Sequence, residues 1–232
     1  MTTILLTGSS RGIGAACAET LATFGATVIG HGTASGIAAD FTDSAAVAQL
    51  WATALDRADG AIDVLVNNAG VFEPASIELG EELWLDRWDR TMRINLTASA
   101  QLCRLAVRHW QERAVSGRIV NVASRAAYRG DSPQHWHYAA SKAGMVAMTK
   151  TIARGYAAGG ILAFAVCPGF TMTGMAEDYL ASRGGDKLLA DIPLGRVADP
   201  AEVADVVRFL ALDAPPSMTG AVLDVNGASY VR

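Results

Sequence analysis

Tyr138 and Lys142 stand four residues apart in the stretch Tyr-Ala-Ala-Ser-Lys. The chain holds five tyrosines and three lysines, so few pairs at this spacing are expected by chance. On a helix, residues i and i+4 share a face, which places the ammonium beside the phenol. A free phenol, with a pKa of about 10, is a poor acid or base near neutrality, but a neighbouring cation lowers that pKa. The pair is therefore a candidate proton donor and acceptor, although taken alone it is equally compatible with a solvated helix face.

Polar or glycine-rich residues follow three apolar runs that are typical of buried strands. Ser124 ends the run 119–123, Asn67-Asn68-Ala69-Gly70 follows 62–66, and Pro168-Gly169 follows 161–166. Carboxyl ends of parallel strands lie at one edge of a sheet, and ligands of such sheets bind outside that edge. This common placement favours the catalytic interpretation of the tyrosine and lysine.

A glycine-rich loop, Thr7-Gly8-Ser9-Ser10-Arg11-Gly12-Ile13-Gly14, lies between the first apolar run and the first helical pattern. Glycines permit a tight turn and let the backbone approach a pyrophosphate. The following helix N-terminus offers unpaired N–H groups to the phosphates. Glycine spacing alone would be weak evidence, but a glycine-rich loop between a strand and a helix predicts a dinucleotide site.

The end of the second strand indicates which dinucleotide binds. An acidic residue there binds the adenosine ribose and repels a 2′-phosphate, but this chain has His31-Gly32-Thr33. Arg11 is placed to pair with a 2′-phosphate and Thr33 to hydrogen-bond it. Asp40, beyond the third strand, is a candidate for binding the adenine. We therefore expect NADP(H) rather than NAD(H), the alternative being that Arg11 is a solvated loop charge.

Strands and helices alternate along the chain. Strands are predicted at 3–7, 27–31, 37–39, 62–66, 117–123, 161–166 and 221–225, and helices at 13–24, 44–57, 81–95, 96–114, 138–158 and 200–212. This alternation predicts an α/β fold, a Rossmann-like doubly wound parallel sheet with helices on both faces. No linker or repeat interrupts it, so we expect a single domain spanning 1–232.

Composition excludes several classes of protein. The 232 residues are 51% hydrophobic and 18% charged with net charge −4, which excludes disorder and disfavours nucleic-acid binding. The longest apolar run, 161–167, is shorter than the roughly 18 residues of a membrane span. Cys17, Cys103 and Cys167 are expected to be buried thiols in a reducing compartment. No signal peptide is visible, so we expect a cytoplasmic protein.

Together these motifs resemble the short-chain dehydrogenase/reductase family over essentially the whole chain. The motifs that carry the resemblance are Thr7–Gly14, Asn67–Gly70, Asn95, Ser124, Tyr138 with Lys142, Pro168-Gly169-Phe170-Thr171-Met172-Thr173, Pro193-Leu194-Gly195-Arg196 and Thr219-Gly220…Val225-Asn226-Gly227. The branch that looks most similar is the 3-oxoacyl-[acyl-carrier-protein] reductase type, whose Thr-Gly-x-Ser-Arg-Gly-Ile-Gly loop is matched.

The resemblance implies a sheet of about seven strands in the order 3-2-1-4-5-6-7 and a role for each catalytic residue. Tyr138 would exchange a proton with the carbonyl oxygen, and Ser124 would orient that oxygen. Lys142 would hold the nicotinamide ribose and lower the Tyr138 pKa, and Asn95 would anchor a water linking Lys142 to solvent. The cofactor would contact Gly8, Ser10, Arg11, Gly12, Ile13, Gly14, Thr33, Asp40, Phe41, Asn68, Ala69, Gly70, Tyr138, Lys142, Pro168, Gly169, Thr171 and Thr173. No metal site is implied.

This chain also departs from the family pattern. Only residues 32–36 connect the second and third strands, where the family has a helix, so the adenine pocket should be more open. The segment 171–192 corresponds to the family's substrate lid. His135, Trp136 and His137 precede the catalytic tyrosine and would line the substrate mouth, or Trp136 would pack the loop onto the body.

Three functions remain open. The first is an NADP(H)-dependent oxidoreductase acting on a small carbonyl or alcohol substrate. The second is the carrier-protein reductase of fatty-acid synthesis, disfavoured because Val115 and Gly159 replace arginines that would bind an acidic carrier. The third is a catalytically weak nucleotide-binding sensor. The apolar helices 96–114 and 139–158 predict a homotetramer, or a dimer, with Ala139, Ala140, Ala143, Met145, Val146, Met148 and Ile152 on the second of them.

Overall fold

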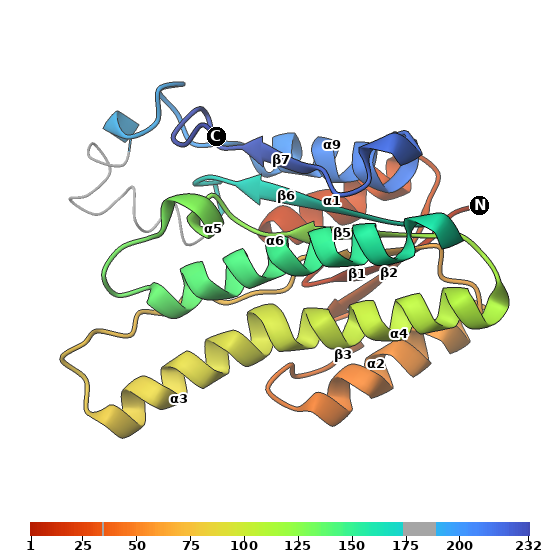
Figure 1. Ribbon diagram of the computed structural model, residues 1–232, viewed down its shortest axis with the longest axis horizontal. Coiled ribbons are helices and arrows are strands. Elements are labelled where there is room, and N and C mark those ends of the chain that lie inside the picture. The colour runs from red at the N-terminus through yellow and green to blue at the C-terminus, as the bar shows by residue number, and fades with distance from the viewer. Residues whose placement is uncertain (34, 174–188) are drawn as a thin grey trace.

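The computed structural model describes residues 1–33, 35–173 and 189–232 of the chain. Within these residues a parallel sheet runs in the order β3-β2-β1-β4-β5-β6-β7, which confirms the predicted fold class and strand order. The chain crosses over after β3 and continues outward from β1 on the other side, as in a doubly wound fold (Figure 1). The strands are β1 (Thr3–Thr7), β2 (Thr27–Gly32), β3 (Ile37–Ala38), β4 (Val64–Asn67), β5 (Gly117–Val122), β6 (Ile161–Pro168) and β7 (Val222–Val225).

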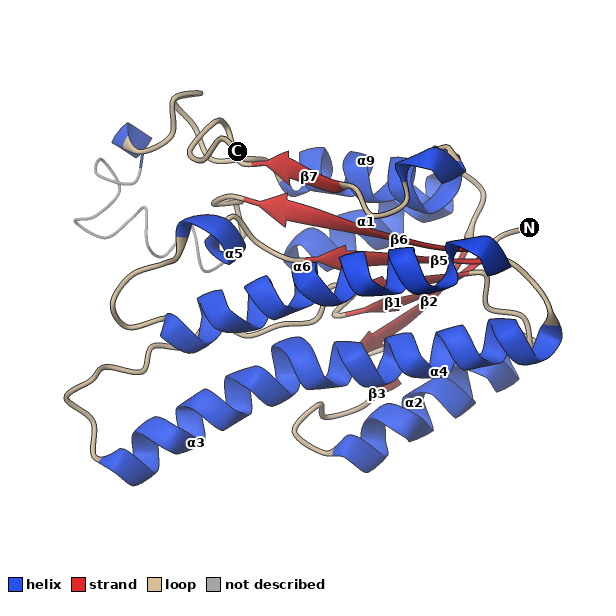
Figure 2. Cartoon of the chain, viewed as in Figure 1, coloured by secondary structure: helices blue, strands red, loops and turns tan. Residues whose placement is uncertain are grey.

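Helices cover both faces of the sheet. One hydrophobic cluster joins the sheet to α2, α4 and α6, and a second joins its other face to α1 and α9. Figure 2 shows α4 and α6 in front of the strands and α1 and α9 behind them, with α2 and α3 below the sheet in this view. The α-helices are α1 (Gly12–Thr23), α2 (Ser44–Arg57), α3 (Glu81–Met92), α4 (Ala98–Arg113), α5 (Ala126–Arg129), α6 (Trp136–Tyr156) and α9 (Pro200–Arg208).

Burial on both faces explains the apolar composition of the central strands. Alternate residues of β1 belong to different clusters, since Leu5 lies in the first and Ile4 and Leu6 in the second. All residues of β6, Ile161–Pro168, are buried. A strand covered on both faces has no polar side, so it reads as a continuous apolar run.

The predicted helices 81–95 and 96–114 form one rod rather than two separate helices. A π-helical segment, Arg93–Thr97, joins α3 to α4 without a turn (Figure 1). The sequence has no proline or glycine between residues 81 and 113, so nothing breaks the helix. A π-helical segment accommodates an extra residue inside a helix and is frequent at functional sites. Here it contains Asn95.

Two short 3₁₀ segments and a second π-helical segment complete the helical elements. They are Ala157–Gly159, Pro216–Met218 and Phe209–Asp213. The three cysteines are buried free thiols, as expected. In the described part of the chain, no helix has the length and apolar character needed to cross a membrane. Most of the predicted lid, residues 174–188, lies outside the described residues.

Candidate active site at the carboxyl edge of the sheet

The glycine loop is formed by backbone conformations and close contacts that require glycine. Gly8 and Gly12 have φ angles of +67° and +53°, in the left-handed region that favours glycine. A Cβ on Gly14 would lie 1.9 Å from the carbonyl oxygen of Gly8, so a side chain there would block the turn. A Cβ on Gly12 would lie 2.9 Å from Cγ2 of Thr173, which shows that Thr173 reaches the loop. The loop leads directly into the N-terminus of α1.

Thr7 and Asn68 tie the glycine loop to the end of β4. The buried Thr7 hydroxyl accepts from the backbone N–H of Asn68 and of Ala69, both at 3.0 Å. The Asn68 side-chain amide donates to the carbonyl oxygens of Thr7 and Gly8, also at 3.0 Å. The Asn68 side chain thus holds the loop in place. The sequence assigned it to the cofactor and did not predict this contact.

His31 is a residue of this site that the sequence analysis did not select. It is the second-last residue of β2, close to the position where an acidic residue would indicate NAD(H), and its side chain is buried. Nδ1 accepts from the Gly8 N–H at 3.3 Å, and Nε2 lies 3.1 Å from the Ala39 carbonyl oxygen. The ring also stacks on Phe41, with centroids 4.3 Å apart. Burial lowers the pKa of His31, so the ring is neutral and carries its proton on Nε2.

The other residues assigned to the adenosine end lie around His31. Arg11 is the N-cap residue that precedes α1 and is exposed, and Thr33 is exposed after β2. The Asp40 carboxylate accepts from the Thr42 N–H at 2.9 Å, and this bond lowers the Asp40 pKa. Phe41 is buried in the first hydrophobic cluster.

Ser124, Tyr138 and Lys142 meet at the ends of β5 and β6. The Ser124 hydroxyl lowers the pKa of the Tyr138 phenol, and the Ser124 oxygen accepts from the Ala126 N–H at 3.1 Å. Lys142 is buried, and its Nζ donates to the Val122 carbonyl oxygen at 2.9 Å. Nζ lies 5.8 Å from the centroid of the Tyr138 ring. The helical spacing therefore brings phenol and ammonium onto one side of α6, as the sequence predicted.

The sequence predicted that Lys142 lowers the Tyr138 pKa, and this direction is wrong for the protein chain without a cofactor. Desolvation raises the pKa of Tyr138 to about 12, although the Ser124 hydrogen bond opposes it. Desolvation also lowers the pKa of Lys142 to about 8. Both groups lose water, and burial disfavours the charged form of each. At neutral pH the phenol is consequently protonated, which suits a proton donor.

Asn95 is buried in the π-helical segment and makes three side-chain hydrogen bonds. Its Oδ1 accepts from the Val71 N–H at 2.8 Å, and its Nδ2 donates to the Val71 carbonyl at 3.0 Å and the Ser141 hydroxyl at 3.3 Å. A Cβ on Gly70 would lie 3.3 Å from Asn95 Oδ1 and 3.6 Å from Lys142 Nζ. Gly70 therefore lets the end of β4 approach both polar side chains.

A buried polar chain beneath these residues was not predicted. Asn67 Nδ2 donates to Asn121 Oδ1 at 2.9 Å, and Asn121 Nδ2 donates to the Thr149 hydroxyl at 2.8 Å. The three side chains connect β4, β5 and α6. Such bonds have a strong directional requirement in a buried setting, so they fix the position of the helix that carries Tyr138 and Lys142.

The end of β6 closes the site on the side of α9. Thr171 is buried, its hydroxyl donates to the Gly169 carbonyl oxygen at 3.3 Å, and its backbone forms a bridge with Ala198. A Cβ on Gly169 would lie 2.9 Å from Cα of Asn226, so Pro168-Gly169 packs tightly against the end of β7.

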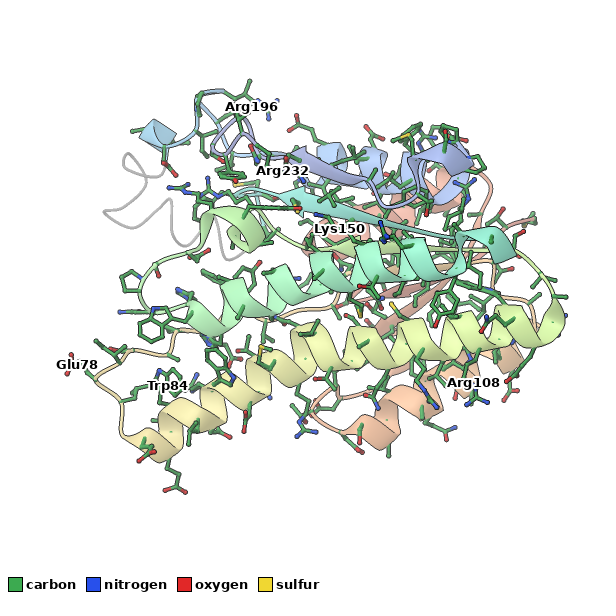
Figure 3. The ribbon with its side chains drawn as sticks, in the orientation of Figure 1. Glu78, Trp84, Arg108, Lys150, Arg196 and Arg232 are labelled. Carbon is green, nitrogen blue, oxygen red and sulfur yellow. The ribbon has the colours of Figure 1, made fainter. Side chains whose placement is uncertain are left out.

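Aromatic residues before Tyr138 divide between the site and α3. His135 stacks on Phe72 with centroids 3.8 Å apart, and Phe72 meets the Tyr138 ring edge-on at 4.8 Å. Trp136 is 54% exposed and lies edge-on to Trp84 of α3 at 6.4 Å (Figure 3). His135 therefore reaches the site through Phe72, whereas Trp136 packs on a neighbouring helix.

Known proteins resemble this chain over almost all of its length. A family profile described as enoyl-(acyl-carrier-protein) reductase matches residues 8–228. A 3-oxoacyl-[acyl-carrier-protein] reductase of Vibrio harveyi is 36% identical over 98% of this chain and 96% of its own. Proteins with the same name from Synechocystis sp. and Escherichia coli are 37% and 34% identical, covering 96% and 98% of this chain and 94% and 96% of their own. The chain belongs to the short-chain dehydrogenase/reductase family.

Membership establishes the class of reaction. This chain is an NAD(P)-dependent oxidoreductase that interconverts carbonyl and alcohol groups. The enoyl reductase of the profile and the 3-oxoacyl reductases differ in the bond that they reduce. A hydroxyl and a protonated phenol suit a carbonyl oxygen, which must be oriented and protonated.

Proposed function

We propose that this chain is an NADP(H)-dependent oxidoreductase of a small carbonyl or alcohol substrate, with Tyr138 as acid and base. The observation that supports the proposal most strongly is the placement of the buried Lys142 Nζ, which bonds to the Val122 carbonyl oxygen at the end of β5 and lies 5.8 Å from the centroid of the Tyr138 ring. In the reduction, Ser124 orients the carbonyl oxygen and Tyr138 donates a proton to it. In the oxidation, Tyr138 takes the hydroxyl proton. The cofactor supplies or accepts the hydride when it is bound.

The residues present fit a dinucleotide. Gly8 packs against Ala69 and Gly14 against the Gly8 carbonyl oxygen too closely for a Cβ, and this tight turn leads into the N-terminus of α1, whose N–H groups suit a pyrophosphate. No carboxylate ends β2, and the exposed Arg11 supports a 2′-phosphate. Lys142 would hold the nicotinamide ribose, and Asn95 would anchor a water leading from it. The cofactor would also contact Ser10, Gly12, Ile13, Thr33, Asp40, Phe41, Asn68, Ala69, Gly70, Pro168, Gly169, Thr171 and Thr173.

Reduction of a 3-oxoacyl thioester on an acyl carrier protein is the second candidate. It is favoured by three relatives with this name that match almost the whole chain. The absence of arginine at Val115 and Gly159 argues less strongly against it than the sequence suggested. Val115 precedes β5 and Gly159 precedes β6, at the amino edge of the sheet and away from this chain's own site.

We also propose that the chain acts in the cytoplasm as a homotetramer built on α4 and α6. Half-buried small residues on α6, Ala139, Ala140 and Ala143, support a close approach of a second copy. Met145, Val146 and Ile152 cannot contribute, because they are buried in the core of this chain. A monomer by light scattering at micromolar concentration would refute the assembly.

The decisive assay follows NADPH and NADH absorbance against a panel of carbonyls and alcohols that includes a 3-oxoacyl thioester. We expect turnover by the wild type and, for Tyr138→Phe, a loss of roughly 10²–10⁴-fold. Turnover unaffected by this substitution would contradict the proposed acid–base role. If the wild-type protein converts no compound of the panel, the result would favour the nucleotide-binding sensor.

Cofactor choice is tested by Arg11→Ala. We expect the KM for NADPH to rise about tenfold, equivalent to the loss of a charge-assisted bond of about 1.4 kcal/mol, with little change for NADH. An equal effect on both cofactors would show that Arg11 does not recognise the 2′-phosphate.

A further inference from the structure

Two arginines immediately after the catalytic serine share one carboxylate. Arg125 follows Ser124, and Arg129 ends the short helix α5. Arg129 pairs with both oxygens of Asp191, its Nη2 donating to Oδ1 at 3.1 Å. Arg125 Nη1 reaches Asp191 Oδ2 only at 3.5 Å. One carboxylate thus lies between two guanidinium groups.

Arg125 is the more buried of the two arginines and the less completely paired. Its side chain is 11% exposed, whereas those of Arg129 and Asp191 are 36% and 42% exposed. Its guanidinium lies 4.8 Å from the ring centroid of Phe170. A buried charge requires close partners, yet the side-chain hydrogen bond that Arg125 makes among the described residues is long. The pairing with the solvated Asp191 is also weakened by water.

Arg125 lies beside the reacting groups. Its backbone N–H donates to the Pro168 carbonyl oxygen at 2.9 Å, which places it between the ends of β5 and β6. A substrate held at Ser124 and Tyr138 is therefore close to Arg125.

We propose that Arg125 and Arg129 bind a carboxylate of the substrate, and that the Asp191 carboxylate holds this place until the substrate displaces it. The proposal rests on the proposed function, since it names the substrate class of the same site: small carbonyl compounds that carry a carboxylate. Guanidinium groups match the two oxygens of a carboxylate, and the exposed Asp191 can leave into water.

The kinetic test compares 4-formylbenzoate with its neutral methyl ester, which share the reacting aldehyde and the ring. For Arg125→Gln we expect kcat/KM to fall at least tenfold with the carboxylate and less than twofold with the ester. Asp191→Asn should lower the KM for the carboxylate several-fold, because it removes the competitor. If Arg125 merely fastens α5, both aldehydes lose activity equally and Asp191→Asn improves neither, which would overturn the proposal.

A binding measurement separates this proposal from the reaction itself. We expect benzoate to bind the wild type in calorimetry and to bind Arg125→Gln at least tenfold more weakly. Benzoate binding that depends on Arg125, with no carbonyl reduced, would refute the proposed function alone. Reduction of the ester, with no benzoate binding or with equal binding by both proteins, would refute the carboxylate site alone.

Arg208→Gln is the matched control. Arg208 pairs with Asp213 and lies 4.4 Å from the Phe24 ring centroid. Its substitution therefore removes the same kinds of contact as the substitution of Arg125. Phe24 follows α1 and Asp213 precedes β7, away from the carboxyl edge. We expect this variant to keep the wild-type ratio of kcat/KM for the two aldehydes and the wild-type benzoate affinity.

Discussion

The ends of β4, β5 and β6 form a catalytic half of the carboxyl edge, and the ends of β1, β2 and β3 form an adenosine half. In the catalytic half, side chains bond to one another across elements, as in the chain from Asn67 through Asn121 to Thr149. In the adenosine half, β2 ends at Gly32 and β3 begins at Ile37, and a neutral His31 lies one residue before the end of β2. The comparison indicates that proton transfer demands a fixed arrangement, whereas nucleotide binding relies on backbone groups that different side chains can support.

The largest effect is expected from Lys142→Met, in the catalytic half. We expect kcat/KM for carbonyl reduction to fall roughly 10²-fold or more. The wild-type kcat/KM should also fall as the pH rises through about 8, because Lys142 then loses its proton. Tyr138, with a pKa of about 12, stays protonated over this range. This limb should be missing from the pH profile of the variant.

The control for this variant is Lys150→Met, on the same helix. Lys150 lies 5.8 Å from the Tyr128 ring centroid, away from Tyr138 (Figure 3). Its rate and pH profile should match the wild type. If the two lysine variants behave alike, the catalytic half does not depend on the buried ammonium.

An intermediate effect is expected in the adenosine half from protonation of His31. The folded chain holds His31 neutral with a lowered pKa, so the unfolded chain binds the extra proton more readily. Stability is therefore present above about pH 6.5, the ordinary pKa of histidine, and is lost as the pH falls below it. A protonated Nδ1 no longer accepts from the Gly8 N–H, and a lost buried hydrogen bond costs about 1–3 kcal/mol.

Denaturant unfolding at pH 7.5 and pH 5.5 measures this effect. His31→Gln keeps a donor and an acceptor without a titrating ring, so it should lose less stability between the two pH values than the wild type. An equal pH dependence of both proteins would show that His31 does not couple the glycine loop to pH.

The smallest effect is expected from Asp43→Ala, at the start of α2. The Asp43 carboxylate accepts from the Ala45 N–H at 2.8 Å and caps the helix, so its loss should cost about 1 kcal/mol. We expect the unfolding free energy to fall and the kcat/KM for both substrate and cofactor to stay unchanged. A change in cofactor KM would show that the adenosine half is coupled to α2 more tightly than the comparison implies.

The resemblance to the family supplied the strand order, whereas the sequence patterns by themselves determined the fold class and the pairing of Tyr138 with Lys142. These follow from local patterns, since apolar runs, glycine positions and the i,i+4 spacing are read within a few residues. The Asp43 cap is equally local, because its carboxylate accepts from the N–H of Ala45, two residues further along the chain.

Only the tertiary structure decided how residues distant in sequence share hydrogen bonds and charge. His31 and Gly8 are 23 residues apart, and Arg129 and Asp191 are 62 apart, so no spacing rule connects them. The Tyr138 pKa is likewise set by the desolvation that the surrounding elements impose, and local spacing led to the wrong direction. Burial and long-range contacts depend on the packed chain as a whole, and these set the chemistry of the site.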